Sequence, residues 1–319
     1  RPLTRFGLSH AGALTAAASV DAETGPRVVG IHFHLDGYSA LDRVQAIDQA
    51  FVLVDELATA GHRLEFLDIG GGIPISYLDS PEQWDAFWDH QQRALDHPRP
   101  LTYGDQLLNT VYPYYQSPVR GPWLESVLSA ECTTGTSIAR AIEQRGLELR
   151  SEPGRSLLDG CGMTVARVEF RKPRGDGSWL IGVAMNRTQC RATSDDFMVD
   201  PILVRPPGRE DDPEIDGYLV GAYCIERELL TVRRMTFPTG VQVGDLIVFP
   251  NTAGYLMHIL ESASHQMPLA KNVIVTDLQP PVLDLIDQPA QGAAPTATKA
   301  DPSTVVSSGC GWITGNSQH

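Results

Sequence analysis

The stretch Ser151-Glu152-Pro153-Gly154-Arg155 places a carboxylate at the end of a predicted strand and turns the chain directly after it. Two earlier strands are predicted over 28–34 and 64–69. The first of them ends at a histidine, His34, and the second runs into Gly70-Gly71-Gly72. All three predicted strands therefore end in residues that suit the binding of a ligand better than the packing of a core.

Helical segments separate these strands. Ser39 is a favourable N-cap, apolar residues recur at helical spacing from Val44 to Leu57, and Ser137 begins a short helix that Gly146 closes. Repeated strand–helix units indicate a parallel sheet, and the strand ends are where a (β/α)8 barrel has its active site. Only about three or four units fit before residue 158, whereas a full barrel takes roughly 250 residues. The sequence thus predicts the C-terminal half of a barrel.

A second domain follows. Further strands are predicted over 163–170, 179–183, 218–220, 229–233 and 246–249. Asp176-Gly177 is a hairpin signal between the first two, so we expect a mostly antiparallel β domain. The predicted boundaries are 1–158 for the partial barrel, 159–286 for the β domain and 287–319 for a disordered tail rich in Pro, Ala, Ser and Thr. Residues 98–134 are interpreted as a loop-rich insertion.

Composition excludes several classes of protein. The 319 residues carry a net charge of −14, which argues against a nucleic-acid partner. No apolar run approaches the length of a membrane span. The five cysteines show no CxxC spacing, which argues against a disulfide framework or a zinc site and favours the cytoplasm. We expect no metal, no nucleic acid and no membrane.

The glycine triplet, the Glu152–Arg155 stretch and Gly221-Ala222-Tyr223-Cys224 occur in an order and at separations that resemble the fold-type III pyridoxal-phosphate (PLP) enzymes. This is the family of diaminopimelate, ornithine and arginine decarboxylases, and the resemblance spans about residues 5–275. It implies an alanine-racemase-like barrel followed by a β domain, PLP as cofactor, an amino acid as substrate, and a homodimer with shared active sites.

The resemblance assigns the cofactor site to residues of the predicted strand ends. It implies that His34 stacks on the cofactor ring and belongs to the catalytic residues, while His32 is interpreted as a barrel-core histidine. Glu152 would keep the pyridine nitrogen protonated, so that the ring accepts electrons from the substrate Cα. The residues that would contact the cofactor phosphate are Gly70, Gly71, Gly72, Gly154, Arg155 and Tyr255.

In the second domain the resemblance implies residues that meet the substrate. Cys224 would be catalytic and would reach the site of a partner subunit. Arg191 would bind the substrate carboxylate. Ile225 stands where diaminopimelate decarboxylases have a glutamate, which makes diaminopimelate a poorer candidate substrate. Glu226 or Glu228 would then meet a distal amine.

The family holds its cofactor on a lysine of the first barrel strand. The three lysines here are Lys172, Lys271 and Lys299, and none ends a strand of the predicted barrel. We therefore expect an N-terminally truncated PLP-dependent amino-acid decarboxylase that is inactive as this fragment alone. The alternatives are a racemase of the same fold and a non-catalytic regulator that dimerises.

Overall fold

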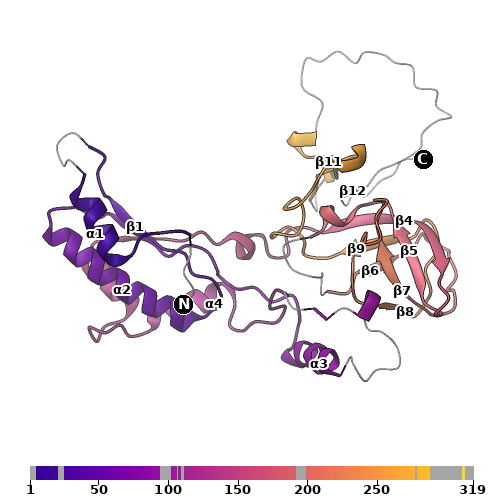
Figure 1. Cartoon of the computed structure of the whole chain (residues 1–319), viewed down its shortest axis with the longest axis horizontal. Coiled ribbons are helices and arrows are strands. Elements are labelled where there is room, and N and C mark those ends of the chain that lie inside the picture. Colours follow the sequence, from indigo (N-terminus) through magenta and orange to yellow (C-terminus); the bar gives the residue numbers. More distant parts are fainter. Residues whose placement is uncertain are drawn as a thin grey trace, which may run out of the picture. The chain divides into compact units, whose positions relative to one another are not determined.

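The structure is a computed structural model that describes residues 5–20, 25–93, 102–105, 107–108, 111–191, 199–276, 279–287 and 311–312. The chain divides into two compact units, Arg1–Ser76 with Gln116–Leu157, and Tyr77–Tyr115 with Leu158–His319. The positions of the parts relative to one another are not determined (Figure 1), and each unit is described by itself.

The first unit is built of helices and a small parallel sheet. Its elements are α1 (His10–Ala18), β1 (Gly30–His32), α2 (Ala40–Thr59), β2 (Phe66–Asp68), α4 (Arg120–Ser129), α5 (Ile138–Gln144) and β3 (Glu148–Arg150). The strands pair in the order β1-β2-β3, and both pairs are parallel. In register, His32 lies opposite Asp68, and Asp68 lies opposite Arg150. The predicted parallel sheet of strand–helix units is confirmed.

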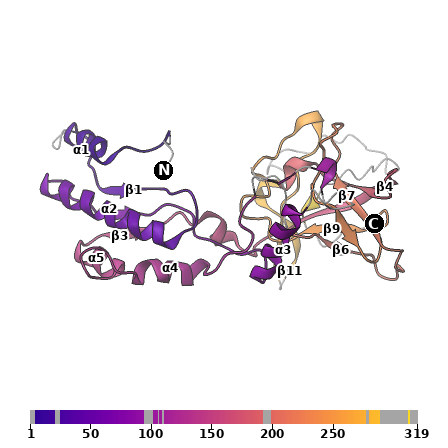
Figure 2. The ribbon, with the colours of Figure 1, turned by 60° about the horizontal axis from the view of Figure 1, so that its bottom comes forward.

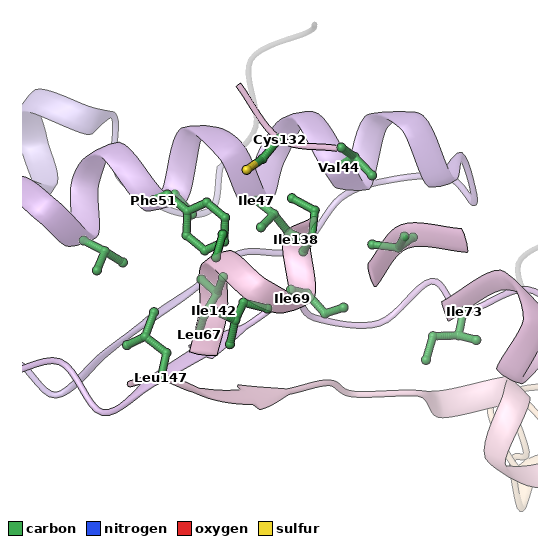
Figure 3. Close-up of a cluster of buried hydrophobic side chains, with 14 of the residues drawn as sticks. Val44, Ile47, Phe51, Leu67, Ile69, Ile73, Cys132, Ile138, Ile142 and Leu147 are labelled. Carbon is green, nitrogen blue, oxygen red and sulfur yellow. The ribbon is translucent and has the colours of Figure 1, made fainter. Parts of the chain in front are cut away.

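The core of this unit lies between the sheet and helices α2, α4 and α5 (Figure 2). Ser39 caps α2 as predicted, because its hydroxyl accepts a hydrogen bond from the Asp42 amide at 3.1 Å. One face of α2 then buries Ile47 and Phe51 against Leu67 of β2 (Figure 3). The apolar spacing of this helix in the sequence therefore marks the face that covers the sheet.

The interpretation of residues 98–134 as a loop-rich insertion is wrong for their second part, which forms α4. Trp123 and Val127 of this helix are buried in the core of the first unit. The indole Nε1 of Trp123 also donates a hydrogen bond to the Tyr38 carbonyl at 2.9 Å. Tertiary burial thus supports a helix in a segment whose Pro and Gly content favours loops.

The second unit is mostly β structure. Its helices are α3 (Pro81–Gln92), η2 (Tyr103–Asp105), η4 (Arg187–Gln189), η5 (Ser264–Gln266) and η6 (Leu285–Asp287), and η3 (Gly154–Leu158) links the two units. Its strands are β4 (Thr164–Pro173), β5 (Trp179–Val183), β6 (Ile202–Val204), β7 (Ile215–Val220), β8 (Met235–Phe237), β9 (Leu246–Phe249), β10 (Val273–Thr276), β11 (Gln279–Leu283) and β12 (Gly311–Trp312).

Six strands of this unit follow the order β6-β9-β4-β5-β7-β8, and β12 also pairs with β4. All neighbours are antiparallel except β5 and β7. The predicted strand over 229–233 is wrong, because the structure gives this stretch only two isolated bridges, Val220 with Leu229 and Thr102 with Arg233, instead of a ladder. The pattern also missed five strands, which are β6, β8, β10, β11 and β12.

The segment Tyr77–Tyr115 belongs to the second unit rather than to the sheet of the first. The Tyr77 amide donates to the Tyr114 carbonyl at 2.8 Å, and Tyr114 packs in a small cluster with Leu108 and Val232. The predicted disordered tail at 287–319 lies outside the described residues except for Asp287 and β12. Among the helices that the structure describes, none combines the length and the apolar character of a membrane span.

The packing of α2 generates a stability prediction. Ile47 is fully buried, whereas Val52 of the same helix is 52% exposed. Because Ile47→Ala leaves a cavity in the core, we expect it to lower the free energy of unfolding by about 2–5 kcal/mol. We expect Val52→Ala to change it by less than about 0.5 kcal/mol. Urea denaturation followed by tryptophan fluorescence measures both, and equal effects would contradict this account of the core.

Candidate active site

The three strand ends of the first unit come together because hydrogen bonds continue beyond the strands. The Phe33 amide donates to the Asp68 carbonyl, and the Ile69 amide donates to the Arg150 carbonyl, each at 3.0 Å. One step further, the Glu152 amide donates to the Gly70 carbonyl, also at 3.0 Å. The structure therefore places the His34, glycine and Glu152 motifs side by side at one edge of the sheet.

The glycine turn leaves no room for side chains. A Cβ on Gly70 would lie 2.5 Å from the Phe33 carbonyl oxygen, and one on Gly71 would lie 2.8 Å from that of Glu152. Gly70 and Gly72 also have φ angles of +68° and +81°, which L residues rarely adopt. Gly70 and Gly71 are thus required by the close approach of the neighbouring strand ends, and Gly72 by its φ angle and the nearby Arg43 side chain.

Arg43 of α2 supports this turn through hydrogen bonds to two backbone carbonyls. Its guanidinium donates through Nη1 to the Ile69 carbonyl and through Nη2 to the Gly71 carbonyl, each at 2.8 Å. The side chain is 1% exposed, and its guanidinium carbon lies 5.9 Å from the ring centres of both Phe33 and Trp123. The sequence interpretation missed Arg43. The available signal was an arginine one turn before Ile47 on the apolar face of a helix.

His34 and Glu152 face one another at the open edge. Glu152 Oε2 lies 3.8 Å from His34 Nδ1 and 3.4 Å from His32 Nε2. The side chain of His32, which the sequence suggests is a barrel-core histidine, is 49% exposed in this unit and points to the same carboxylate. Ligand atoms of these three residues all lie within 4.8 Å of one another, so the set could also hold a metal ion.

Two backbone amides of the glycine turn donate hydrogen bonds within the protein. The Gly70 amide donates to Asp68 Oδ1 at 2.9 Å, and the Gly71 amide donates to His34 Nδ1 at 3.2 Å. A phosphate that used these amides would take the place of both contacts. Gly154, at a φ of +53°, begins the η3 turn that carries Arg155 directly after Glu152.

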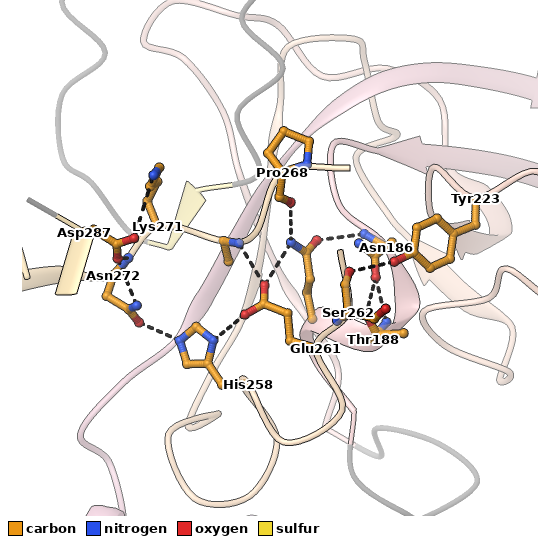
Figure 4. A network of polar contacts seen from close by, with 12 residues as sticks. Asn186, Thr188, Tyr223, His258, Glu261, Ser262, Pro268, Lys271, Asn272 and Asp287 are labelled. Atoms are coloured by element: carbon orange, nitrogen blue, oxygen red, sulfur yellow. Dashed lines mark hydrogen bonds and ion pairs between the residues drawn. The ribbon is translucent and has the colours of Figure 1, made fainter. Parts of the chain in front are cut away.

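In the second unit, three loops that carry predicted site residues are bonded to one another. The Ala222 amide, two residues before Cys224, donates to the Met185 carbonyl at 2.9 Å. The Arg191 amide donates at 3.0 Å to the carbonyl of Leu256, the neighbour of Tyr255. Tyr223 Oη donates to the Ser262 carbonyl at 2.9 Å (Figure 4). Cys224 itself is exposed and free.

The loop of Tyr255 is strained. Tyr255 has a φ of +63°, an uncommon conformation for a bulky residue, and its side chain is half-exposed. The turn is fixed nearby by Asn251, which donates to Asp159 Oδ1 at 2.7 Å and accepts from the Gly160 amide at 2.8 Å. Such strain persists only where the surroundings enforce it, and it is concentrated at functional sites.

The two acidic residues after Cys224 have different environments. Glu228 is 4% exposed, and its Oε1 accepts a hydrogen bond from the Arg187 amide at 2.8 Å. Burial raises the pKa of the Glu228 carboxyl. Glu226 is exposed and accepts a hydrogen bond from Tyr103 Oη. Of the two predicted partners for a distal amine, only Glu226 is accessible in this unit.

Comparison with known proteins tests the resemblance that the sequence motifs suggest. The profile described as "Pyridoxal-dependent decarboxylase, pyridoxal binding domain" matches residues 3–99. The chain is 33% identical to an uncharacterized protein, y4yA, of Sinorhizobium fredii over 280 residues, or 86% of this chain and 60% of that protein. It is 25% identical to the diaminopimelate decarboxylase of Neisseria meningitidis over 259 residues, or 79% of this chain and 50% of the relative. These comparisons confirm the predicted resemblance to the fold-type III PLP-dependent decarboxylase family.

Solved structures of this decarboxylase family share the fold. Diaminopimelate decarboxylase from Helicobacter pylori, complexed with L-lysine, matches with a TM-score of 0.59 and 17% identity over 87% of this chain and 56% of that one. Lysine/ornithine decarboxylase from Vibrio vulnificus, complexed with cadaverine, matches with a TM-score of 0.57 and 18% identity over 82% and 57% of the two chains. The chain thus spans about half of these decarboxylases, and the predicted cofactor, PLP, is that of the family.

The glycine turn generates a second prediction. Arg43→Met leaves the buried carbonyls of Ile69 and Gly71 without donors, which costs about 1–3 kcal/mol for each group. We expect a lower melting temperature and weaker retention of PLP after gel filtration. The control is Arg63→Met, which changes an exposed arginine of the same unit and should leave both quantities unchanged. Retention of PLP by the Arg43 variant at the level of this control would show that the turn holds its shape without the guanidinium.

Proposed function

We propose that this chain is part of a PLP-dependent amino-acid decarboxylase. The observation that carries the proposal is the meeting of His34, the glycine turn and Glu152 at the carboxyl edge of a parallel sheet, in a chain that resembles this family. On this proposal the first unit is the C-terminal half of a (β/α)8 barrel. The domain boundaries at 158 and 286, the homodimer and the cytoplasmic location remain predictions of the sequence.

The residues at the sheet edge fit the parts of the cofactor. The side chains of His34 and Glu152 are more than half exposed and therefore accessible to a planar ring. The glycine turn lets a phosphate approach backbone amides closely. Arg155 lies in η3, after the strand end that carries Glu152. Bound PLP supplies an electron sink for the substrate Cα.

The chain's own residues position that cofactor and handle protons. We assign to Glu152 the task of holding a proton on the pyridine nitrogen, because a carboxylate beside that nitrogen favours its charged form. His34 orients the ring by stacking. The cofactor phosphate is held by Gly70, Gly71, Gly72, Gly154, Arg155 and Tyr255. From the second unit, Arg191 binds the substrate carboxylate and Cys224 delivers a proton to Cα.

Loss of the charge on Glu152 tests the proposal. In the protein expressed from its complete gene, we expect Glu152→Gln to retain PLP but to lower turnover by about 10²–10⁴-fold, the range for a positioned proton-handling group. Glu148→Gln on the same strand is the control, since Glu148 is exposed and pairs with Arg150. Release of CO2 separates decarboxylation from racemisation. Near-normal turnover by the Glu152 variant would remove this residue from the mechanism.

A shared site in a homodimer makes a separate prediction for Cys224. If each site takes Glu152 from one subunit and Cys224 from the other, a mixture of inactive Glu152→Gln and Cys224→Ala proteins forms heterodimers with one intact site. We expect activity to return on mixing, to about a quarter of the wild-type level with random exchange. No recovery despite subunit exchange verified by native mass spectrometry would place Cys224 in its own subunit's site or outside any site.

A further inference from the structure

The segment Tyr77–Tyr115 contacts the loop that carries Cys224 through Tyr103. The Tyr103 amide donates to the Val232 carbonyl at 2.9 Å, and Thr102 forms an isolated antiparallel bridge with Arg233. The backbone at Thr102 and Tyr103 is therefore held on the second unit, at residues that follow Glu226 closely in the sequence. The sequence interpretation gave the segment no function.

The Tyr103 ring is held by two neighbours. It meets the Tyr218 ring edge-on, with ring centres 5.3 Å apart and planes at 87°. The Arg174 guanidinium carbon lies 5.0 Å from the Tyr103 ring centre. These contacts use the ring, so they do not depend on the phenolic hydroxyl.

The hydroxyl of Tyr103 donates a hydrogen bond to Glu226 Oε1, two residues after Cys224. This hydrogen bond raises the pKa of Tyr103, so the phenol stays protonated and keeps its donor at neutral pH. A carboxylate has about four acceptor positions, so Glu226 retains capacity for a further donor. One donor, on a ring that its neighbours hold in place, therefore orients the Glu226 carboxylate and leaves it able to accept another hydrogen bond.

We propose that Tyr103 is a positioning residue that aims the Glu226 carboxylate at a cationic group on the distal end of the substrate. The inference rests on the proposed decarboxylase function, because it places Cys224 and Glu226 against a substrate. It gives Tyr103 the task of holding that carboxylate in place.

The test compares a ligand that has the distal charge with one that lacks it. In the PLP-loaded protein from the complete gene, calorimetry measures the binding of cadaverine and of pentylamine, which differ by one amine. We expect Tyr103→Phe to weaken cadaverine about tenfold, as for loss of a hydrogen bond to a charged group, and to change pentylamine less than about twofold. For L-lysine as substrate, we expect KM to rise by a similar factor while kcat is unchanged.

Three controls separate positioning from general stability. Glu226→Gln should weaken cadaverine at least as much, and the double variant should bind it no more weakly than Glu226→Gln does, because the two residues act as one unit. Tyr112→Phe removes a hydroxyl from the aromatic cluster of the same segment and should leave both ligands unaffected.

The outcomes distinguish this inference from the proposed function. Equal weakening of cadaverine and pentylamine by Tyr103→Phe, or no weakening of either, would overturn the role of Tyr103. Selective weakening of cadaverine in a protein that releases no CO2 from any basic amino acid would support Tyr103 and overturn the decarboxylase proposal. A wild-type protein that binds the two amines equally would overturn the assignment of Glu226, and that of Tyr103 with it.

Discussion

The candidate site depends on the hydrogen bonds of one buried guanidinium, that of Arg43. It lies near the Phe33 and Trp123 rings. It ties helix α2 to the carbonyls of Ile69 and Gly71, and so it fixes the turn that leaves β2. A buried charge is costly unless it is hydrogen-bonded, and here two backbone carbonyls accept hydrogen bonds from Nη1 and Nη2. Because Gly71 also packs on the Glu152 backbone, this one side chain sets the spacing between two of the three strand ends.

The residues assigned under the proposed function are of different kinds in the two units. The first unit supplies backbone amides, a histidine ring and a carboxylate on the ends of paired strands. The second supplies side chains on loops that are bonded to one another, as the contacts of Tyr223 and of the Asn186–Thr188 turn with Ser262 show (Figure 4). Loops positioned by a folded scaffold are where binding residues are often found.

Strand ends and their motifs could be predicted from the sequence because each depends on local signals. Glycines after an apolar run and Glu-Pro-Gly-Arg after another are visible without knowledge of the neighbours. Long-range effects were not visible. Arg43 is buried near Phe33 and Trp123, which are distant from it in the sequence. Trp123 of α4 packs in the core, and His32 is half-exposed in this unit. The hydrogen bond of Tyr103 to Glu226 joins residues 123 positions apart, and no local pattern predicts it.

The central claim, that the glycine turn, His34 and Glu152 form the cofactor site, is tested most directly by a titration with pyridoxamine phosphate followed by NMR of backbone amides. This amine needs no lysine to bind, so the test reports on residues 1–319 themselves. We expect saturable chemical-shift changes at Gly70, Gly71, Gly72 and Gly154 and in the His34 ring. Arg43→Met should abolish all of them together. Saturable binding that leaves these residues unshifted, or no binding at all, would contradict it.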